Sequence, residues 1–144
     1  MEDTHSYTTN VTWKKGRLGI LSSDGLPSFE VATPPGFANG VPNTWSPEHL
    51  FVASAVACLM TTFLAIAENS KLEFESFKCS GTGKIEKVDG IFMMSEIELK
   101  PVVKILDPSK EERTLRIIEK SEKNCLISNS MKSNITLSPK IVTG

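Results

Sequence analysis

Hydrophobic and polar residues form three short segments in the first part of the chain, separated by turn residues. The segments cover residues 7–13, 17–22 and 29–32. The first is rich in Tyr, Thr, Val and Trp, which favour β-strands. Lys15-Gly16 and Ser23-Asp24-Gly25 separate the segments, and Gly and Asp are typical turn residues. The pattern predicts three short strands joined by tight turns.

The longest apolar run is residues 50–67, which are 18 residues without a charge. Ser46 before it is a good N-cap, Pro47 suits the first helical position, and Glu48 suits the positive end of the helix dipole. We therefore predict a helix over residues 46–69, which is ~34 Å long at ~1.5 Å per residue.

The same run reaches the lower limit of length for a membrane-spanning helix. It has Glu48 and Glu68 at its ends and no flanking Lys or Arg, whereas membrane helices are anchored by basic and aromatic residues. We therefore expect no membrane partner. The prediction is a helix buried on nearly every side inside a soluble protein.

A hairpin pattern opens the second half of the chain. Apolar or small residues alternate with polar ones over residues 77–86, and residues 91–105 form the returning segment. Asp89-Gly90 lies between them and is a typical two-residue hairpin turn. These features predict two long antiparallel strands.

An amphipathic helix and a last strand complete the pattern. The helix is expected to begin near Asp107-Pro108, because Ser109 and Glu112 have the spacing of a capping box, and to end around Cys125. Its apolar residues lie near one stripe, formed by Leu115, Ile118, Cys125 and Leu126. Residues 135–142 are predicted to form one final strand.

The predicted order is βββ-α-ββ-α-β, which indicates an α+β fold with mostly antiparallel sheet. A length of 144 residues, with 40% hydrophobic and 23% charged residues, suits one globular domain over residues 1–144. The loop over residues 33–45 is long enough to be functional. We do not predict a domain boundary there, because the strands before the loop have no core partner of their own. A net charge of −1 argues against a nucleic-acid partner.

The three cysteines decide which chemistry remains open. Residues 1–5 show no basic segment followed by an apolar one, so no signal peptide is expected and a reducing, cytoplasmic setting is favoured. Cys58, Cys79 and Cys125 lack CxxC-like spacing, which argues against a zinc site. No Gly-rich phosphate loop precedes a helix. We expect neither a metal nor another cofactor.

Each cysteine also has a structural interpretation. Cys79 lies on the alternating face with Phe77 and Ile85, as a core thiol would. Cys58 lies in the middle of the predicted helix, where a core thiol is again common. The residues alone therefore indicate an α+β domain with thiol chemistry as one option.

Three segments carry a resemblance to a known family. Residues 46–51 (SPEHLF) with 53–58 (ASAVAC), Gly16-Arg17 with residues 22–25 (SSDG), and residues 125–130 (CLISNS) resemble the corresponding segments of the OsmC/Ohr family, the osmotically inducible and organic hydroperoxide resistance proteins. The order and spacing of the three segments match, and the resemblance covers essentially the whole chain. Leu126 stands where the hydroperoxide resistance branch usually has Pro, so the chain resembles OsmC or a general OsmC-like member.

The resemblance implies a fold, an assembly and an activity. The fold has antiparallel sheets around long central helices, in an obligate intertwined homodimer. The activity is thiol-dependent reduction of organic hydroperoxides, with Cys58 as the peroxidatic cysteine and Cys125 as the resolving one. Arg17 and Glu48 correspond to the activating pair.

Physical chemistry makes the activating pair reasonable. A thiol with a pKa of about 8.5 is mostly protonated at neutral pH, and the helix dipole gives little help three turns into a helix. Arg17 supplies a permanent cation, and Glu48 would hold it in place. Glu48 and Cys58 are ten residues apart, roughly 15 Å along one helix. Either the loop and Arg17 bridge that gap, or Glu48 comes from a second chain.

The expected cycle passes from a Cys58 sulfenic acid to a Cys58–Cys125 disulfide, which a small or protein-borne dithiol reduces. Apolar side chains near the site would favour organic over hydrogen peroxide, and the candidates are Phe37, Trp45, Phe51 and Met60. Two alternatives stay open. One is a non-enzymatic OsmC-like dimer that binds an apolar small molecule, and the other is a structural or partner-binding domain with unreactive thiols.

Overall fold

The computed structural model describes residues 3–144. Met1 and Glu2, on which part of the signal-peptide expectation rests, lie outside the described residues. The backbone forms two compact units, one ending at Leu50 and the other spanning Phe51–Gly144, and each is described by itself. A single domain over residues 1–144 stays a prediction.

The first unit contains a three-stranded antiparallel sheet in the order β1-β2-β3. Its strands are β1 (Asn10–Lys15), β2 (Leu18–Ser22) and β3 (Phe29–Ala32). Gly16 and Gly25 occupy the two turns with φ of 52° and 78°, a conformation that favours glycine. The three predicted strands are confirmed, although the first begins at Asn10 rather than at Tyr7.

This first unit buries almost nothing. Among residues 3–50 only Gly19, Ala32 and Ser46 are buried. The large apolar side chains of β1, Val11 and Trp13, are 65% and 75% exposed. The three strands therefore have no hydrophobic core of their own, as the sequence indicated.

Helix α1 (Pro47–Asn69) confirms the predicted long helix and its start. Ser46 caps it, because the Ser46 Oγ accepts a hydrogen bond from the His49 backbone N–H at 3.1 Å. The buried side chains recur every fourth residue, at Ala55, Leu59, Phe63 and Ala67.

The prediction that this helix is buried on nearly every side is wrong for the single chain. Met60 and Leu64 are 39% and 40% exposed, because one sheet covers only one side of a helix. By length and composition α1 is also long and apolar enough to cross a membrane. That is weak evidence, because the core helices of soluble proteins pass the same test.

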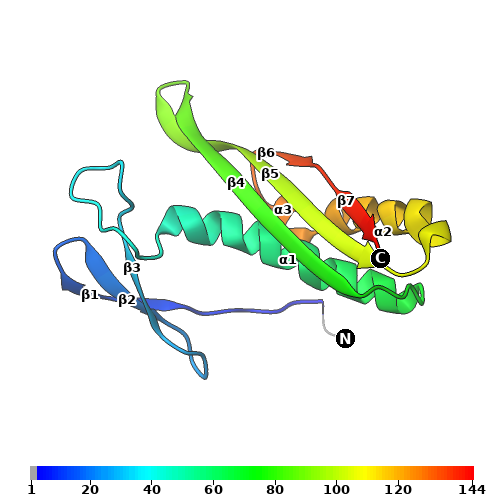
Figure 1. Ribbon diagram of the computed structural model, residues 1–144. Coiled ribbons are helices and arrows are strands. Elements are labelled where there is room, and N and C mark those ends of the chain that lie inside the picture. Colours follow the sequence, from blue (N-terminus) through cyan, green and yellow to red (C-terminus); the bar gives the residue numbers. More distant parts are fainter. Residues whose placement is uncertain (1–2) are drawn as a thin grey trace. The chain divides into compact units, whose positions relative to one another are not determined.

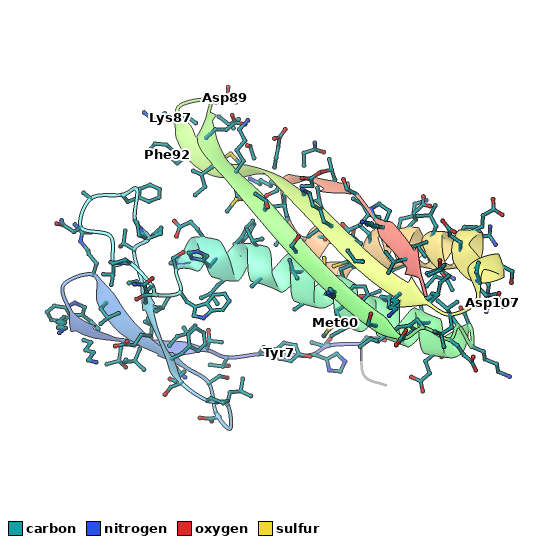
Figure 2. The ribbon with its side chains drawn as sticks, viewed as in Figure 1. Tyr7, Met60, Lys87, Asp89, Phe92 and Asp107 are labelled. Carbon is teal, nitrogen blue, oxygen red and sulfur yellow. The ribbon has the colours of Figure 1, made fainter. Side chains whose placement is uncertain are left out.

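The second unit is organised by the hairpin of β4 (Ser76–Val88) and β5 (Ile91–Ile105), drawn in green and yellow in Figure 1. Asp89 and Gly90 form its tip (Figure 2) with φ of 52° and 81°, which confirms the predicted turn. The positive φ at both central residues is that of the turn types favoured in two-residue hairpins.

The predicted final strand is wrong in one respect, because two short strands replace it. These are β6 (Asn134–Leu137) and β7 (Lys140–Thr143), and both pair with β5 in parallel. The interruption falls at Ser138-Pro139, because a proline has no N–H to donate to a ladder. Leu137 pairs with Leu99 and Lys140 pairs with Val102, so Pro101 of β5 lies between the β5–β6 and β5–β7 ladders. At that place the missing N–H of Pro101 removes no hydrogen bond from either ladder.

The predicted second helix is divided into three pieces. A 3₁₀ turn, η1 (Pro108–Lys110), leads into α2 (Glu111–Lys123), and α3 (Leu126–Asn129) follows. The expected capping box is absent from this described segment. Instead the Asp107 carboxylate accepts a hydrogen bond from the Ser109 backbone N–H at 3.0 Å, so the observed cap lies two residues before the predicted one.

The predicted apolar stripe of this helix is only half right. Ile118 and Cys125 are buried, but Leu115 and Leu126 are 36% and 68% exposed. The remaining buried places of α2 are taken by Ile117 and by two small polar residues, Thr114 and Ser121. The hydroxyls of Thr114 and Ser121 donate to backbone carbonyls one turn earlier. Internal hydrogen bonds therefore allow polar residues on a face where apolar ones were expected.

Helices α1 and α2 pack on the same face of the sheet. Every second residue of β5 is buried there, and together with α1 and α2 these residues form two neighbouring clusters. The buried apolar residues of β5 are Ile97, Leu99, Val103 and Ile105. Two glycines of β4 lie where α1 approaches most closely, because a Cβ at Gly81 would lie 2.5 Å from Val56 Cγ2 and one at Gly83 would lie 2.6 Å from Val52 Cγ2.

We expect Gly81→Ala to lower the free energy of unfolding by about 1–3 kcal/mol, the usual cost of overpacking a core. The added methyl group would clash with Val56, whose branched side chain has little rotamer freedom. Urea unfolding monitored by circular dichroism measures the effect. Ser80→Ala, on the exposed neighbouring position, is the control and should stay within about 0.5 kcal/mol. An unchanged midpoint for Gly81→Ala would show that α1 can move away from the sheet.

Candidate functional site

Two of the three cysteines lie together. Cys58 is half-buried in the middle of α1, and Cys125 is fully buried between α2 and α3. Cys58 lies close enough to Cys125 to raise the pKa of its thiol, although the two residues come from elements far apart in the chain. All three cysteines are free thiols. The fold therefore places two reduced sulfur atoms side by side.

The Cys58 thiol has a polar neighbour one turn further along the helix. Its Sγ lies 3.8 Å from the Thr62 Oγ1, which is long for a hydrogen bond but within the range of a sulfur contact. Cys58 thus lies at the edge of the buried stripe of α1, between the core and the surface.

The Cys125 thiol is held from the other side by Ser128. Burial raises the pKa of the Cys125 thiol, and the hydrogen bond and charge of Cys58 raise it further. Ser128 acts in the opposite direction, through a hydroxyl hydrogen bond and a backbone N–H that donates to Cys125 Sγ at 3.5 Å. The net pKa is raised, so Cys125 is a protonated thiol at neutral pH.

Cys79 is the third thiol and has a different setting. It is half-buried on β4 and packs against the cluster that contains Ala55 and Leu59. Burial raises the pKa of the Cys79 thiol and the charge of Glu122 raises it too, while a backbone hydrogen bond from Lys100 lowers it. This position agrees with the core thiol expected from its alternating pattern.

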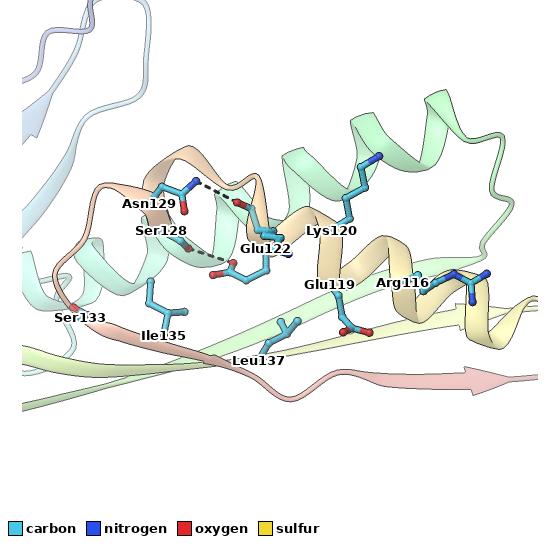
Figure 3. A pocket seen from close by; sticks show the side chains of 10 residues that line it. Arg116, Glu119, Lys120, Glu122, Ser128, Asn129, Ser133, Ile135 and Leu137 are labelled. Atoms are coloured by element: carbon cyan, nitrogen blue, oxygen red, sulfur yellow. Dashed lines mark hydrogen bonds between the residues drawn. The ribbon is translucent and has the colours of Figure 1, made fainter.

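A polar pocket beside Cys125 was not found by sequence reasoning. It has a volume of about 810 Å³ and lies between α2, α3 and β6 (Figure 3). Inside it the Ser128 hydroxyl donates a hydrogen bond to Glu122 Oε1 at 3.2 Å. Glu122, Cys125 and Ser128 recur every third residue, but Cys125 has an extended backbone between α2 and α3, so helical spacing alone could not have placed them together.

Arg17 and Glu48, the predicted activating pair, both belong to the first unit. Arg17 lies exposed in the turn before β2 and lines a pocket of about 330 Å³. Glu48 is half-buried, and its Oε1 is buried without a hydrogen-bond partner. Among residues 3–144 no ion pair joins the two side chains. The expected pairing of Arg17 with Glu48 is therefore not made within one chain.

The four apolar candidates for substrate binding lie in both units. Phe37 and Trp45 belong to the first, and Trp45 meets the rings of Phe29 and His49 edge-on at 6.4 and 6.1 Å. Phe51 and Met60 are nine positions apart on α1, which is about half a turn around the helix. All four are between 38% and 51% exposed. Phe51 and Met60 therefore face different sides of α1.

Across residues 3–144, no three side chains of His, Cys, Asp or Glu come together in a way that could hold a metal ion.

Known proteins include relatives of this chain. A family model described as OsmC-like protein matches residues 40–140. The organic hydroperoxide resistance protein OhrB of Bacillus subtilis is 28% identical over 132 residues, which cover 90% of this chain and 93% of OhrB. The uncharacterized protein YmaD of the same organism is 26% identical over 142 residues, which cover 95% of this chain and 93% of YmaD.

Solved structures show the same fold. An OsmC-like protein of unknown function from Vibrio cholerae superposes with a TM-score of 0.85 at 22% identity, covering 94% of this chain and 99% of the other. An organic hydroperoxide resistance protein from Elizabethkingia anophelis gives a TM-score of 0.78 at 24% identity and covers 100% of both chains. At these identities the comparison establishes the fold alone.

The burial and raised pKa of Cys125 predict an order of reaction with thiol reagents. In the reduced protein at pH 7, iodoacetamide should label Cys125 more slowly than the half-buried Cys58. Raising the pH should speed the labelling of Cys125 as its thiol ionises. Replacing Cys58 by Ala removes a neighbour that raises the pKa of Cys125, so its labelling should begin at lower pH. Timed labelling with peptide mass mapping measures all three rates, and faster labelling of Cys125 than of Cys58 would contradict the assignment.

Proposed function

The chain belongs to the OsmC-like protein family, and on this premise we propose that it is a thiol-dependent peroxidase that reduces organic hydroperoxides to alcohols. The observation that carries the proposal is the contact between the free thiols of Cys58 and Cys125. A peroxidase with two cysteines needs such a pair, because the second sulfur must reach the first after oxidation. The relative OhrB is named an organic hydroperoxide resistance protein, which supports the same substrate class.

The proposed reaction balances over three steps. The Cys58 thiolate attacks the terminal oxygen of the hydroperoxide, so that an S–O bond forms, the O–O bond breaks and the alcohol leaves after taking up a proton. Cys125 then attacks the Cys58 sulfenic acid, forming the S–S bond and releasing water. A dithiol reduces this disulfide by exchange and is itself oxidised. The electrons come from thiols throughout, so the cycle requires no metal, flavin or haem.

Activation of Cys58 is proposed to depend on Arg17 and Glu48. Cys58 lies too far inside α1 for the helix dipole to stabilise its thiolate, and a guanidinium supplies the missing positive charge without ever losing its proton. The buried, unpartnered oxygen of Glu48 supports this role, because such an oxygen is costly unless a donor reaches it. We propose that Arg17 and Glu48 meet only in the assembled protein.

The assembly proposed is an intertwined homodimer in which Glu48 of one chain completes the site of the other. An apolar ridge on the uncovered side of α1 supports this homodimer. Its members are spaced four, three and four residues apart, as in a helix–helix seam. The ridge consists of Ala53, Ala57, Met60 and Leu64. The exposed Val11 and Trp13 of the first unit supply further apolar surface of the kind that obligate dimers bury over about 2,000 Å² or more.

The substrate pocket is proposed to use the four apolar candidates of both chains. Phe51 and Cys58 are seven residues apart and share a side of α1, whereas Met60 lies on the ridge that would meet the partner. Phe37 and Trp45 would cover the site from the first unit. This apolar lining favours organic hydroperoxides over hydrogen peroxide. We further propose a cytoplasmic location, where thiol reductants keep the pair reduced.

We expect one equivalent of cumene hydroperoxide to produce a Cys58–Cys125 disulfide and to leave Cys79 as a free thiol. Cys58→Ser should abolish hydroperoxide consumption, and Cys125→Ser should stop the reaction at the Cys58 sulfenic acid, because the resolving sulfur is missing. Cys79→Ser is the matched control and should keep the wild-type rate. Non-reducing peptide mapping with a peroxide assay measures these outcomes. A bridge that contains Cys79 would contradict the proposal.

Hybrid dimers test whether two chains build one site. Glu48→Ala and Cys58→Ser homodimers should both be inactive. If the site is shared, a hybrid of the two has one site with both groups and one with neither, so it should regain about half the wild-type rate, as two-fold symmetry requires. Co-expression with two affinity tags isolates the hybrid.

Two results would contradict the assembly proposal. An inactive but folded hybrid would show that each site is built from one chain. A folded monomer of 15.8 kDa that still reduces hydroperoxide, detected by light scattering, would show that the active protein needs no partner.

A further inference from the structure

Polar contacts connect the thiol pair with the polar pocket of the second unit. Cys58 lies close enough to Cys125 to raise the pKa of its thiol, and the Ser128 backbone N–H donates a hydrogen bond to Cys125 Sγ at 3.5 Å. The Ser128 hydroxyl donates to Glu122 Oε1 at 3.2 Å. Ser128 therefore stands between a thiol that must lose a proton and a carboxylate that can accept one.

Glu122 has the surroundings of a proton acceptor. It is half-buried on α2, and burial raises the pKa of its carboxyl group, while the hydrogen bond from Ser128 lowers it. The charged groups that line the same pocket all lie on α2, and the strand β6 contributes Ile135 and Leu137. Those charged groups are Arg116, Glu119, Lys120 and Lys123. On β4, Cys79 lies close enough to feel the charge of Glu122.

The pocket gives Glu122 a route to solvent. Figure 3 shows the Glu122 and Ser128 side chains joined by a hydrogen bond, with the side chains of Ile135 and Leu137 alongside. The volume of about 810 Å³ is large enough for several water molecules. A proton that reaches Glu122 can therefore leave to the solvent without crossing the core.

We propose that Ser128 and Glu122 form a proton relay that ionises Cys125 for disulfide formation. The inference rests on the proposed two-cysteine cycle and adds the residues that control its second step. Ser128 touches the reacting sulfur and takes part in the proton transfer. Glu122 acts through Ser128 and is a positioning residue that also receives the proton.

The relay balances as follows. The Cys125 thiol transfers its proton to Ser128 Oγ while the Ser128 hydroxyl proton passes to Glu122 Oε1. The Cys125 thiolate attacks the Cys58 sulfur, the S–S bond forms, and the S–O bond of the sulfenic acid breaks. The departing hydroxide takes up one proton and becomes water, and Glu122 loses its proton to solvent through the pocket. No further oxidant or reductant enters this step.

The relay resolves a difficulty posed by Cys125 itself. Burial and the neighbouring Cys58 raise the pKa of its thiol, so few molecules carry the thiolate at neutral pH. A base within one hydroxyl of the sulfur removes the proton as the attack proceeds, which is general base catalysis. The raised pKa of Glu122 brings its proton affinity closer to that of the thiol.

The test measures the second step alone in Glu122→Gln, which keeps a hydrogen-bond acceptor for Ser128 but cannot take the proton. After one equivalent of cumene hydroperoxide, dimedone trapping follows the Cys58 sulfenic acid and mass mapping follows the disulfide. We expect hydroperoxide consumption in the first turnover to be unchanged. Disulfide formation at pH 7 should fall roughly 10- to 100-fold, as for a lost general base. Glu119→Gln, in the same pocket, is the control and should form the disulfide at the wild-type rate.

The pH profile separates proton transfer from a structural role. In the wild type the rate of disulfide formation should rise as Glu122 loses its proton and then level off. In Glu122→Gln it should rise only at alkaline pH, where Cys125 ionises unaided. Burial raises the pKa of Glu122 above its value of about 4.3 in the unfolded chain. The folded state therefore loses stability as the pH rises from that value through the pKa of Glu122 in the folded protein. Glu122→Gln should therefore be at least as stable as the wild type at pH 7 by thermal unfolding.

Ser128→Ala provides an independent variant, because it removes the hydroxyl and keeps the backbone N–H that donates to Cys125 Sγ. It should slow disulfide formation as much as Glu122→Gln, and the double variant should be no slower than either, because the two groups act in series. The relay is overturned if Glu122→Gln and Glu119→Gln form the disulfide at equal rates at every pH. The proposed function still stands in that case, provided that Cys58 of the wild type forms a sulfenic acid. If wild-type protein forms neither sulfenic acid nor disulfide, the proposed function itself is overturned.

Discussion

The close packing of helix α1 against the β4–β5 hairpin is the contact on which the rest of the second unit depends. Two glycines of β4, Gly81 and Gly83, leave room for Val52 and Val56 of the helix. This close approach lets Ala55 and Leu59 reach the buried residues of β5. Protein interiors tolerate few voids, so the separation of helix and sheet also sets the position of every other side chain of α1. Cys58 is one of them.

The position of α1 gives Cys58 its chemical neighbours. With the helix in contact with the sheet, its thiol lies at the edge of the core and meets Cys125, which stands where α2 ends and α3 begins. The same junction turns the Ser128 backbone N–H toward the Cys125 sulfur and its hydroxyl toward Glu122. A buried thiol is thereby linked to a carboxylate in a polar pocket, although nothing in the packing itself requires hydrogen bonds there. That link is why we assign the junction a role in the redox step.

The first unit is incomplete in a different sense. Its strands expose Val11 and Trp13, α1 exposes Met60 and Leu64, and Glu48 buries an oxygen without a partner. Exposed apolar surface of this extent marks an interaction site, and an unsatisfied buried oxygen marks a missing donor. A second copy of the chain would meet both needs, which is why the proposed active site and the proposed dimer are inseparable.

The sequence by itself determined the elements and their local boundaries. Ser46-Pro47 predicted the start of α1, Asp89-Gly90 predicted the tip of the hairpin, and the first three strands followed from short β-rich segments, because these signals depend on residues that are neighbours in the chain. Cys58 and Cys125 could be named through family resemblance. Only the tertiary structure decided which side of α1 is buried, that the break in the last strand lies opposite Pro101, and that Glu122 and Ser128 meet beside Cys125. Each of these depends on contacts between segments far apart in sequence, where close packing and hydrogen bonding override the local pattern.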